Sequence, residues 1–169
     1  MIHKRARAET NAVFKKYLEG FPGSDSGLVE AILAFRQAAM QFYVGQESVF
    51  AKHSLTVGRF NLLLLLKSRG DHKLSPSELA HLSLVSRGTV TQFVDTLERD
   101  GLVRRRDDPR DRRSMLIELT AKGETILRKV MPDYLEYASV TIKGLTATER
   151  KTLLKLYQKI NLAHAAAEE

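Results

Sequence analysis

The segment from Arg99 to Arg113 carries the densest charge in the chain. It holds seven arginines and four aspartates but no lysine, so its net charge of +3 supplies nearly half of the formal +7 of the whole protein. A planar guanidinium fits a narrow minor groove of DNA and binds phosphate through two hydrogen bonds. Asp111 lies two residues before Arg113, close enough to hold that guanidinium in one direction. The composition favours a polyanion-binding loop over the plainer alternative, a solvated turn rich in arginine.

A polar helix face precedes this segment. Apolar residues at helical spacing predict one stripe directed at a core, formed by Val90, Phe93, Val94 and Leu97. The remaining face and the helix start offer groups that donate to phosphates and base edges, and these come from Ser86, Arg87, Gly88, Thr89, Thr91 and Gln92. Gly88 also lets the backbone come close to a ligand. Polar helix faces are common, however, and this face alone fits a solvated surface equally well.

The elements around these residues follow the order of a winged helix-turn-helix. Ser75-Pro76-Ser77-Glu78 combines a capping box with proline at the first helical position, which predicts a helix start. We predict a short helix over 76–81, a turn over 82–85, a second helix over 86–100, strands over 102–106 and 115–119, and a polar loop over 107–114. The second helix and the loop are the two predicted DNA contacts.

Helices dominate the rest of the chain. An amphipathic arm is predicted up to Phe21, where Pro22-Gly23 ends it. Further helices are predicted from Leu28 to about Phe50, over 56–68 through the leucine run, after Thr120 with a possible kink at Pro132, and after a second capping box at Thr146. The expected fold class is therefore mainly α with a small β-wing.

Composition excludes several other classes of protein. The chain has 169 residues and no cysteine, which removes disulfides, thiolate metal sites and thiol redox sensing. The five histidines lack paired helical spacing, and no cofactor fingerprint or nucleophile–base pair stands out, so we expect no metal, no cofactor and no enzyme. The carboxylates of Asp107, Asp108 and Asp111 would hold a hard cation only against competition from adjacent arginines. No stretch is apolar enough to span a bilayer, and we expect a soluble, cytoplasmic protein without a membrane partner.

The sequence resembles the MarR family of winged helix-turn-helix transcriptional regulators between about Leu28 and Ala163. The resemblance rests on Leu55-Thr56 with Arg59-Phe60, on the 75–80 segment, on the 86–91 segment with Val94-Asp95 and Leu97-Glu98, on Gly101-Leu102-Val103, and on the 108–113 segment. The arm before Phe21 lies outside the usual pattern of the family.

The resemblance implies a homodimer that binds a pseudo-palindromic operator in double-stranded DNA, as a ligand-responsive repressor. Terminal helices would form a dimerisation platform, which divides the chain into an arm (1–26), a dimerisation helix (27–54), the winged DNA-binding domain (55–125) and C-terminal dimerisation helices (126–169). Each second helix would enter the major groove and each wing tip the adjacent minor groove, with half-sites about one helical turn apart.

The resemblance also assigns roles to single residues. Gly88, Thr89 and Gln92 would read bases, and Arg87 and Thr91 would bind phosphates. Many relatives carry a positive charge at the position of Gln92, and glutamine pairs better with adenine than with guanine. In the wing, Arg113 would enter the minor groove with Asp111 as its orienting partner. The other predicted wing contacts are Arg110 and Arg112.

Many members of the family release DNA when a small aromatic or phenolic acid enters a cleft between winged domain and platform. Candidate lining residues here are Arg36, Tyr43, His53, Arg59 and Phe60, although aromatic residues at helical spacing more often belong to a core. The alternative function is a non-specific nucleic-acid-binding or protein-interaction module that uses the winged fold without a small-molecule effector.

Overall fold

A computed structural model describes residues 2–109 and 111–167, and for residues 2–9, 11, 111–114 and 163–167 it describes the backbone only. The chain divides into two compact units, Met1–Gly45 and Gln46–Glu169. The second unit contains the predicted winged domain, and each unit is described separately.

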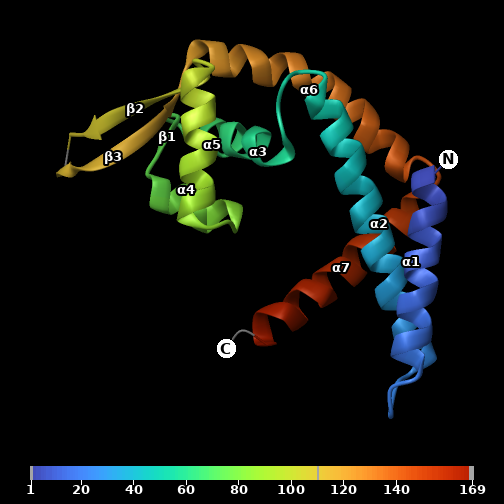
Figure 1. Cartoon of the computed structure of the whole chain (residues 1–169). Helices are drawn as coiled ribbons and strands as arrows, with labels where there is room; N and C mark the ends of the chain where they lie inside the picture. Colours follow the sequence, from blue (N-terminus) through green and yellow to red (C-terminus); the bar gives the residue numbers. More distant parts are fainter. Residues whose placement is uncertain (1, 110, 168–169) are drawn as a thin grey trace. The chain divides into compact units, whose positions relative to one another are not determined.

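The first unit is a pair of helices lying side by side (Figure 1). They are α1 (Ile2–Glu19) and the first part of α2 (Ser26–Ala51). Lys15 Nζ lies 2.7 Å from Glu30 Oε1, and the Arg36 guanidinium lies 4.4 Å from the centre of the Phe14 ring. The predicted stop at Pro22-Gly23 is confirmed, since Gly23 adopts a φ of +81° that favours glycine.

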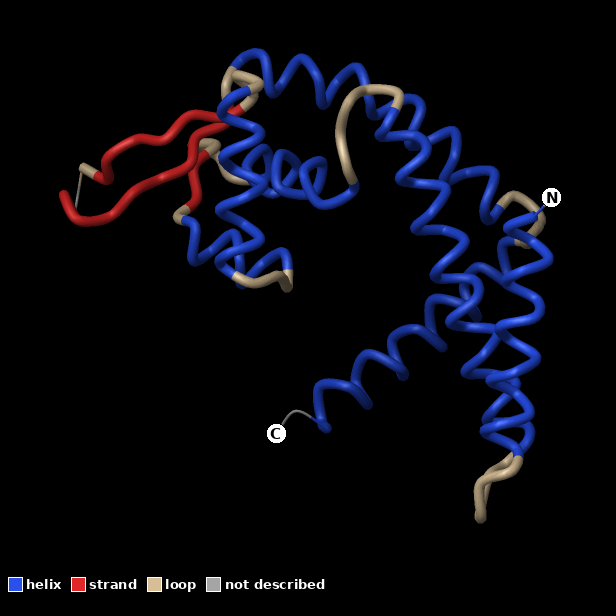
Figure 2. The backbone as a smooth tube through the Cα atoms, in the orientation of Figure 1, coloured by secondary structure: helices blue, strands red, loops and turns tan. Residues whose placement is uncertain are grey.

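The second unit begins with the end of α2 and contains the remaining helices and strands. They are α3 (Val57–Ser68), β1 (Lys73–Leu74), α4 (Pro76–Ser83), α5 (Arg87–Arg99), β2 (Val103–Asp108), β3 (Asp111–Leu119), α6 (Ala121–Ile142) and α7 (Ala147–Ala167). Figure 2 shows the strands as a hairpin that extends from the helices of this unit. The mainly helical class with a small wing is confirmed.

Hydroxyl side chains fix where the helices of the winged domain begin. Thr56, Ser75, Ser86 and Thr120 each accept a hydrogen bond from the backbone N–H three residues later. At Ser75 the capping box is complete, because Glu78 also accepts from the Ser75 backbone N–H at 2.8 Å. Each cap satisfies an N–H that the first helical turn leaves without a partner. The predicted starts therefore agree with the structure.

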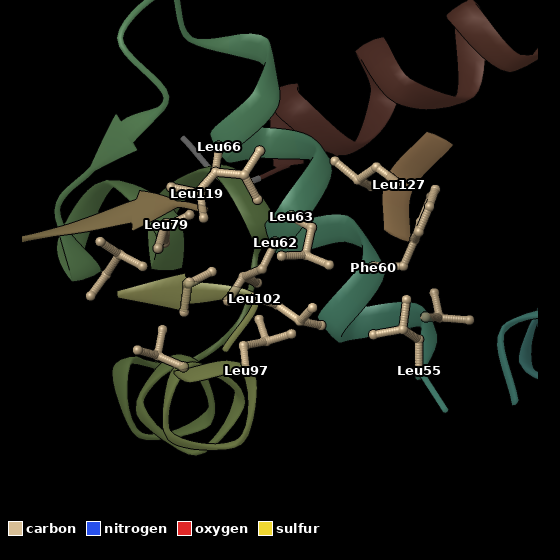
Figure 3. Packing of buried hydrophobic residues seen from close by; sticks show 14 of the residues in the cluster. Leu55, Phe60, Leu62, Leu63, Leu66, Leu79, Leu97, Leu102, Leu119 and Leu127 are labelled. Carbon is tan, nitrogen blue, oxygen red and sulfur yellow. The ribbon is translucent and has the colours of Figure 1, made fainter. Parts of the chain in front are cut away.

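The core of the second unit is built around α3 (Figure 3). Phe60, Leu62, Leu63 and Leu66 are at most 1% exposed, and they pack among buried residues of α5, the strands and α6. Phe50 at the end of α2 stacks on Phe60 with ring centres 4.3 Å apart, and Tyr134 of α6 stacks on Phe50 at 5.5 Å. This apolar cluster holds the winged domain, the end of α2 and α6 together.

The sheet is antiparallel, in the order β1-β3-β2. β1 was not expected from the sequence; its two residues pair with β3, Lys73 with Glu118 and Leu74 with Ile117. The predicted loop over 107–114 is also wrong, because β2 continues to Asp108 and β3 begins at Asp111. Backbone pairing carries the hairpin past the polar residues, with an irregular register between Asp107 and Asp108.

Candidate nucleic-acid interface

Helices α4 and α5 are joined by a tight turn that orients α5. Leu84 ends α4 in the left-handed conformation, with φ +55° and ψ +36°, and Ser86 then caps α5. The predicted stripe is confirmed, since Val90, Val94 and Leu97 are buried and Phe93 is half-buried against the core. The Phe93 ring lies over Gly58 of α3 so closely that a Cβ at residue 58 would come within 2.6 Å of it. Burial of this stripe turns the other face of α5 to the outside.

The outward face carries the predicted reading residues. Ser86, Arg87, Gly88, Thr91 and Gln92 are exposed, and Thr89 is half-buried. The Ser86 hydroxyl accepts from the Thr89 N–H at 3.1 Å and shares a hydrogen bond with Thr89 Oγ1 at 2.8 Å. The two hydroxyls therefore also build the helix cap, and the first-turn N–H groups that remain favour an anion nearby.

Three side chains on this face differ in the hydrogen-bond donors and acceptors that remain available to DNA. Arg87 donates to Ser77 Oγ of α4 at 3.1 Å, which holds the guanidinium across the start of both helices. Thr91 donates to the Arg87 carbonyl at 3.0 Å, so its oxygen is available as an acceptor and its proton must rotate before it meets a phosphate. Among the described residues, the Gln92 amide has no hydrogen-bond partner. Gln92 thus presents both its donors and its acceptor outward.

The arginines of β2 are engaged in ion pairs. Arg105 Nη1 donates to Glu98, Arg105 Nη2 donates to Asp95, and the Arg105 backbone N–H donates to Glu98 Oε1 at 2.9 Å. On the other side of the strand, Arg104 and Arg106 donate through Nε to Glu118 Oε2, at 2.7 and 3.3 Å. The charge of the strand itself is therefore largely neutralised within the protein, which leaves the hairpin tip as the predicted source of cations for DNA.

The pKa of the Glu118 carboxyl is lowered to about 2, first by the hydrogen bond from Arg104 and further by the one from Arg106. A carboxyl with a lower pKa in the folded than in the unfolded state stabilises the fold above its unfolded pKa. That stabilisation is lost as the pH falls from about 4.5 towards about 2.

We expect Glu118→Gln to lower the free energy of unfolding by about 1 kcal/mol at neutral pH, because half-exposed arginines are its partners. The difference from the wild type should shrink as the pH falls from about 4.5 towards about 2, because the carboxyl of the unfolded chain takes up its proton before that of the folded protein does. Urea unfolding followed by circular dichroism at several pH values measures both effects. A difference that stays constant with pH would contradict the pKa assignment.

The predicted wing contacts fall at the hairpin tip. Arg110 and the side chains of Asp111, Arg112 and Arg113 lie outside the described residues, so the orienting role of Asp111 stays a prediction. The backbone from Asp111 onward belongs to β3, and Asp111 pairs with Asp108. The tip is thus a strand end and not a long loop.

The five candidate effector residues are spread over both units. Arg36 and Tyr43 belong to the first unit, where Phe14 covers the Arg36 guanidinium. In the second unit, His53 Nε2 lies 2.8 Å from Asp133 Oδ2, and Arg59 Nη1 lies 3.7 Å from Asp100 Oδ2. Phe60 is 1% exposed and stacked in the core. Arg36, His53, Arg59 and Phe60 thus make contacts that serve the fold, and the effector cleft stays a prediction.

Sequence reasoning missed the side chains that join α5 to its neighbours. Asp95 and Glu98 lie three residues apart on one side of α5, and that spacing signals a shared partner. The partner, Arg105, could be found only from the pairing of β2 with β3, which sends Arg105 to the opposite side of the strand from Arg104 and Arg106. Ser77, the partner of Arg87, has no comparable signal in the sequence.

Within residues 2–109 and 111–167, no three acidic or histidine side chains that the structure describes gather closely enough to hold a metal ion. None of the helices in the described part of the chain combines the length and the apolar character that a membrane crossing requires.

Comparison with known proteins places this geometry in a family. Residues 55–115 match the model of the MarR family. The HTH-type transcriptional repressor YetL of Bacillus subtilis (strain 168) is 33% identical over 83% of this chain and 84% of its own length.

Solved structures share the fold. Sco3205, a MarR family transcriptional regulator from Streptomyces coelicolor solved in complex with DNA, superposes with a TM-score of 0.76 at 22% identity, over 84% of this chain and 91% of that one. BpsR of Bordetella bronchiseptica, whose DNA binding is regulated by 6-hydroxynicotinic acid, gives a TM-score of 0.68 at 23% identity, over 76% and 90% of the two chains. The capped helix-turn-helix and the paired hairpin agree with these relatives. The chain belongs to the MarR family of winged-helix DNA-binding transcriptional regulators, a family of regulators and not of enzymes.

Proposed function

We propose that the protein is a homodimeric repressor that binds a pseudo-palindromic operator and releases it in response to a small molecule. The observation that best supports sequence-specific operator binding is the set of groups exposed on the outward face of α5. There Gly88 leaves the backbone open, and the Gln92 amide has no partner among the described residues. An exposed amide that can both donate and accept matches the edge of adenine in the major groove.

The other reading residues take roles that follow from their contacts. Thr89 is the second base reader and Arg87 binds phosphate, because its guanidinium is held at the edge of the helix pair by Ser77. Arg87→Ala should then weaken all DNA sequences alike, whereas Gln92→Ala should relax the preference at particular base pairs. The wing tip, with Arg110, Arg112 and Arg113, enters the adjacent minor groove.

Exposed apolar side chains on the terminal helices support the homodimer. Such side chains on α2, α6 and α7 are Leu28, Ile32, Phe35, Met40, Tyr43, Val44, Leu135, Val140, Ile142, Leu154, Leu156, Tyr157, Ile160 and Leu162. Apolar side chains exposed along a helix mark a surface that can pack against a partner. We propose that these helices, within 27–54 and 126–169, form the platform and that residues 55–125 form the winged domain, with 1–26 as an additional arm.

The proposed repressor activity and effector draw on the relatives. YetL is described as a repressor, and BpsR as regulated by 6-hydroxynicotinic acid. We propose an effector of the same chemical class, an aromatic acid. A protein that controls transcription meets its operator at the chromosome, so we place it in the cytoplasm.

The substitution Gly88→Ala should change operator affinity without lowering the stability of the fold. A Cβ at residue 88 would meet only Ser86 Oγ, at 3.8 Å, so the substitution leaves the packing of the protein intact. Because alanine is the better helix former by about 1 kcal/mol, the variant should unfold at the same temperature as the wild type or higher. Its operator affinity should nevertheless fall about tenfold, since the methyl group enters the space where DNA approaches.

Thermal unfolding and fluorescence-anisotropy titration of the same preparation measure both quantities. Unchanged operator affinity in Gly88→Ala would place the start of α5 away from the DNA and contradict the proposed function.

A further inference from the structure

Arg105 connects the two parts of the protein that contact DNA. Its side chain and backbone make three hydrogen bonds to α5, one to Asp95 and two to Glu98. Neighbouring residues on the inner side of β2 and β3 are buried, with Val103 and Ile117 each 1% exposed. Ile117 is the cross-strand partner of Arg105, so Arg105 stands where the apolar contact between hairpin and helix ends.

This position sets the direction of the hairpin relative to α5. Beyond Arg105 the hairpin continues to its tip, and among the described residues no other side chain of the hairpin forms an ion pair with α5. A guanidinium fork that binds two carboxylates three residues apart resists rotation better than a single ion pair does. Without it, the outer hairpin is held to α5 by no side-chain hydrogen bond that the structure describes.

The same contacts also screen two negative charges. Asp95 is 58% exposed and Glu98 is 36% exposed, both on the helix proposed to enter the major groove. Carboxylates at a DNA-binding surface repel phosphates unless a cation lies against them. Arg105 supplies that cation from within the protein.

We propose that Arg105 is a positioning residue for operator binding, which aligns the wing tip with the minor groove while α5 occupies the major groove. This inference rests on the proposed function, since it requires both elements to contact the same operator. Exposed ion pairs contribute little to the free energy of unfolding. The role of the Arg105 ion pairs is therefore to fix the angle between the hairpin and α5.

The test compares Arg105→Gln with Arg104→Gln, a matched control. Both substitutions remove one positive charge from β2, but Arg104 binds Glu118 on the other side of the strand. Operator affinity is measured by fluorescence anisotropy. Hydroxyl-radical footprinting reports minor-groove contacts, and methylation protection of guanine N7 reports major-groove contacts.

Arg105→Gln should weaken operator binding at least about tenfold, whereas Arg104→Gln should change it by less than about threefold. In Arg105→Gln the minor-groove protection should disappear while the major-groove protection persists at saturating protein. Arg105→Lys, which keeps the charge but loses the fork, should show the same loss of minor-groove protection. Equal affinities for the two glutamine variants, or parallel loss of both protections, would overturn the inference.

The triple variant Asp95→Asn, Glu98→Gln, Arg105→Gln distinguishes the orientation of the wing tip from the effect of negative charge on α5. This variant removes the two carboxylates that Arg105→Gln leaves without a cation. Its affinity for random DNA should therefore be higher than that of Arg105→Gln, while the minor-groove protection stays absent. Recovery of that protection would show that charge alone is at work and would overturn the positioning role. If instead the wild type shows no preference for the operator over random DNA, the proposed function itself fails.

Discussion

Gly123→Ala should lower the free energy of unfolding by about 3 kcal/mol or more, although alanine is normally the better residue in a helix. Gly123 lies in the first turn of α6, where a Cβ would come within 2.2 Å of the Leu102 carbonyl oxygen and 2.6 Å of Leu119 Cδ1. The first of these atoms belongs to the backbone, so it moves only if the strand start and the helix separate. The junction of wing, α5 and α6 therefore requires glycine at this residue.

Urea unfolding at neutral pH measures the effect, and Gly88→Ala is its matched control. Both glycines lie in the first turn of a helix capped by a hydroxyl, but only Gly123 is enclosed by other atoms. A loss of stability in Gly123→Ala with none in Gly88→Ala supports the packing described here. Equal stability of the two variants would show that α6 does not approach Leu102 this closely.

Arg113→Ala should cost about 1 to 3 kcal/mol of operator binding and leave the protein folded. The expectation combines the sequence of the wing with the charges of the strand that leads to it. Arg104, Arg105 and Arg106 already neutralise Glu118, Asp95 and Glu98, so the arginines that remain for DNA in this segment are those nearer the tip. Among them Arg113 is the one that Asp111 would orient.

Anisotropy titrations at two salt concentrations give the measurement, with Arg106→Gln as the control that removes an arginine already paired in the strand. The operator affinity of Arg113→Ala should fall well below that of Arg106→Gln, and thermal unfolding should be unchanged. If Arg113→Ala bound the operator as tightly as the wild type, the wing tip would not be a DNA contact.

Local chemistry explains which elements were predictable. The starts of α3, α4, α5 and α6 follow from a hydroxyl residue placed before an apolar stripe, because a cap is a contact between residues close in the sequence. The α5 stripe was predictable for the same reason, since a helical period brings Val90, Val94 and Leu97 to one side. These signals were sufficient for the helix-turn-helix and its outward face.

Contacts between distant residues account for what the sequence did not predict. β1 has two residues and exists because Lys73 and Leu74 meet the free edge of β3, which no local pattern announces. The turn-rich residues of the wing suggested a loop, but the pairing of β2 with β3 continues almost to the tip. Likewise, the arginine-rich composition suggested a polyanion-binding loop, whereas Arg104, Arg105 and Arg106 bind carboxylates of the protein itself.

We propose that this chain reads a particular DNA sequence through α5 and the wing. The most direct test selects bound sequences from a random pool of double-stranded DNA and then compares the dissociation constants for the selected sequence and for random DNA at physiological salt. We predict a two-fold related consensus with half-sites about one helical turn apart, bound at least about a thousandfold more tightly than random DNA. Equal affinity for selected and random DNA would contradict the claim and leave a non-specific nucleic-acid-binding protein.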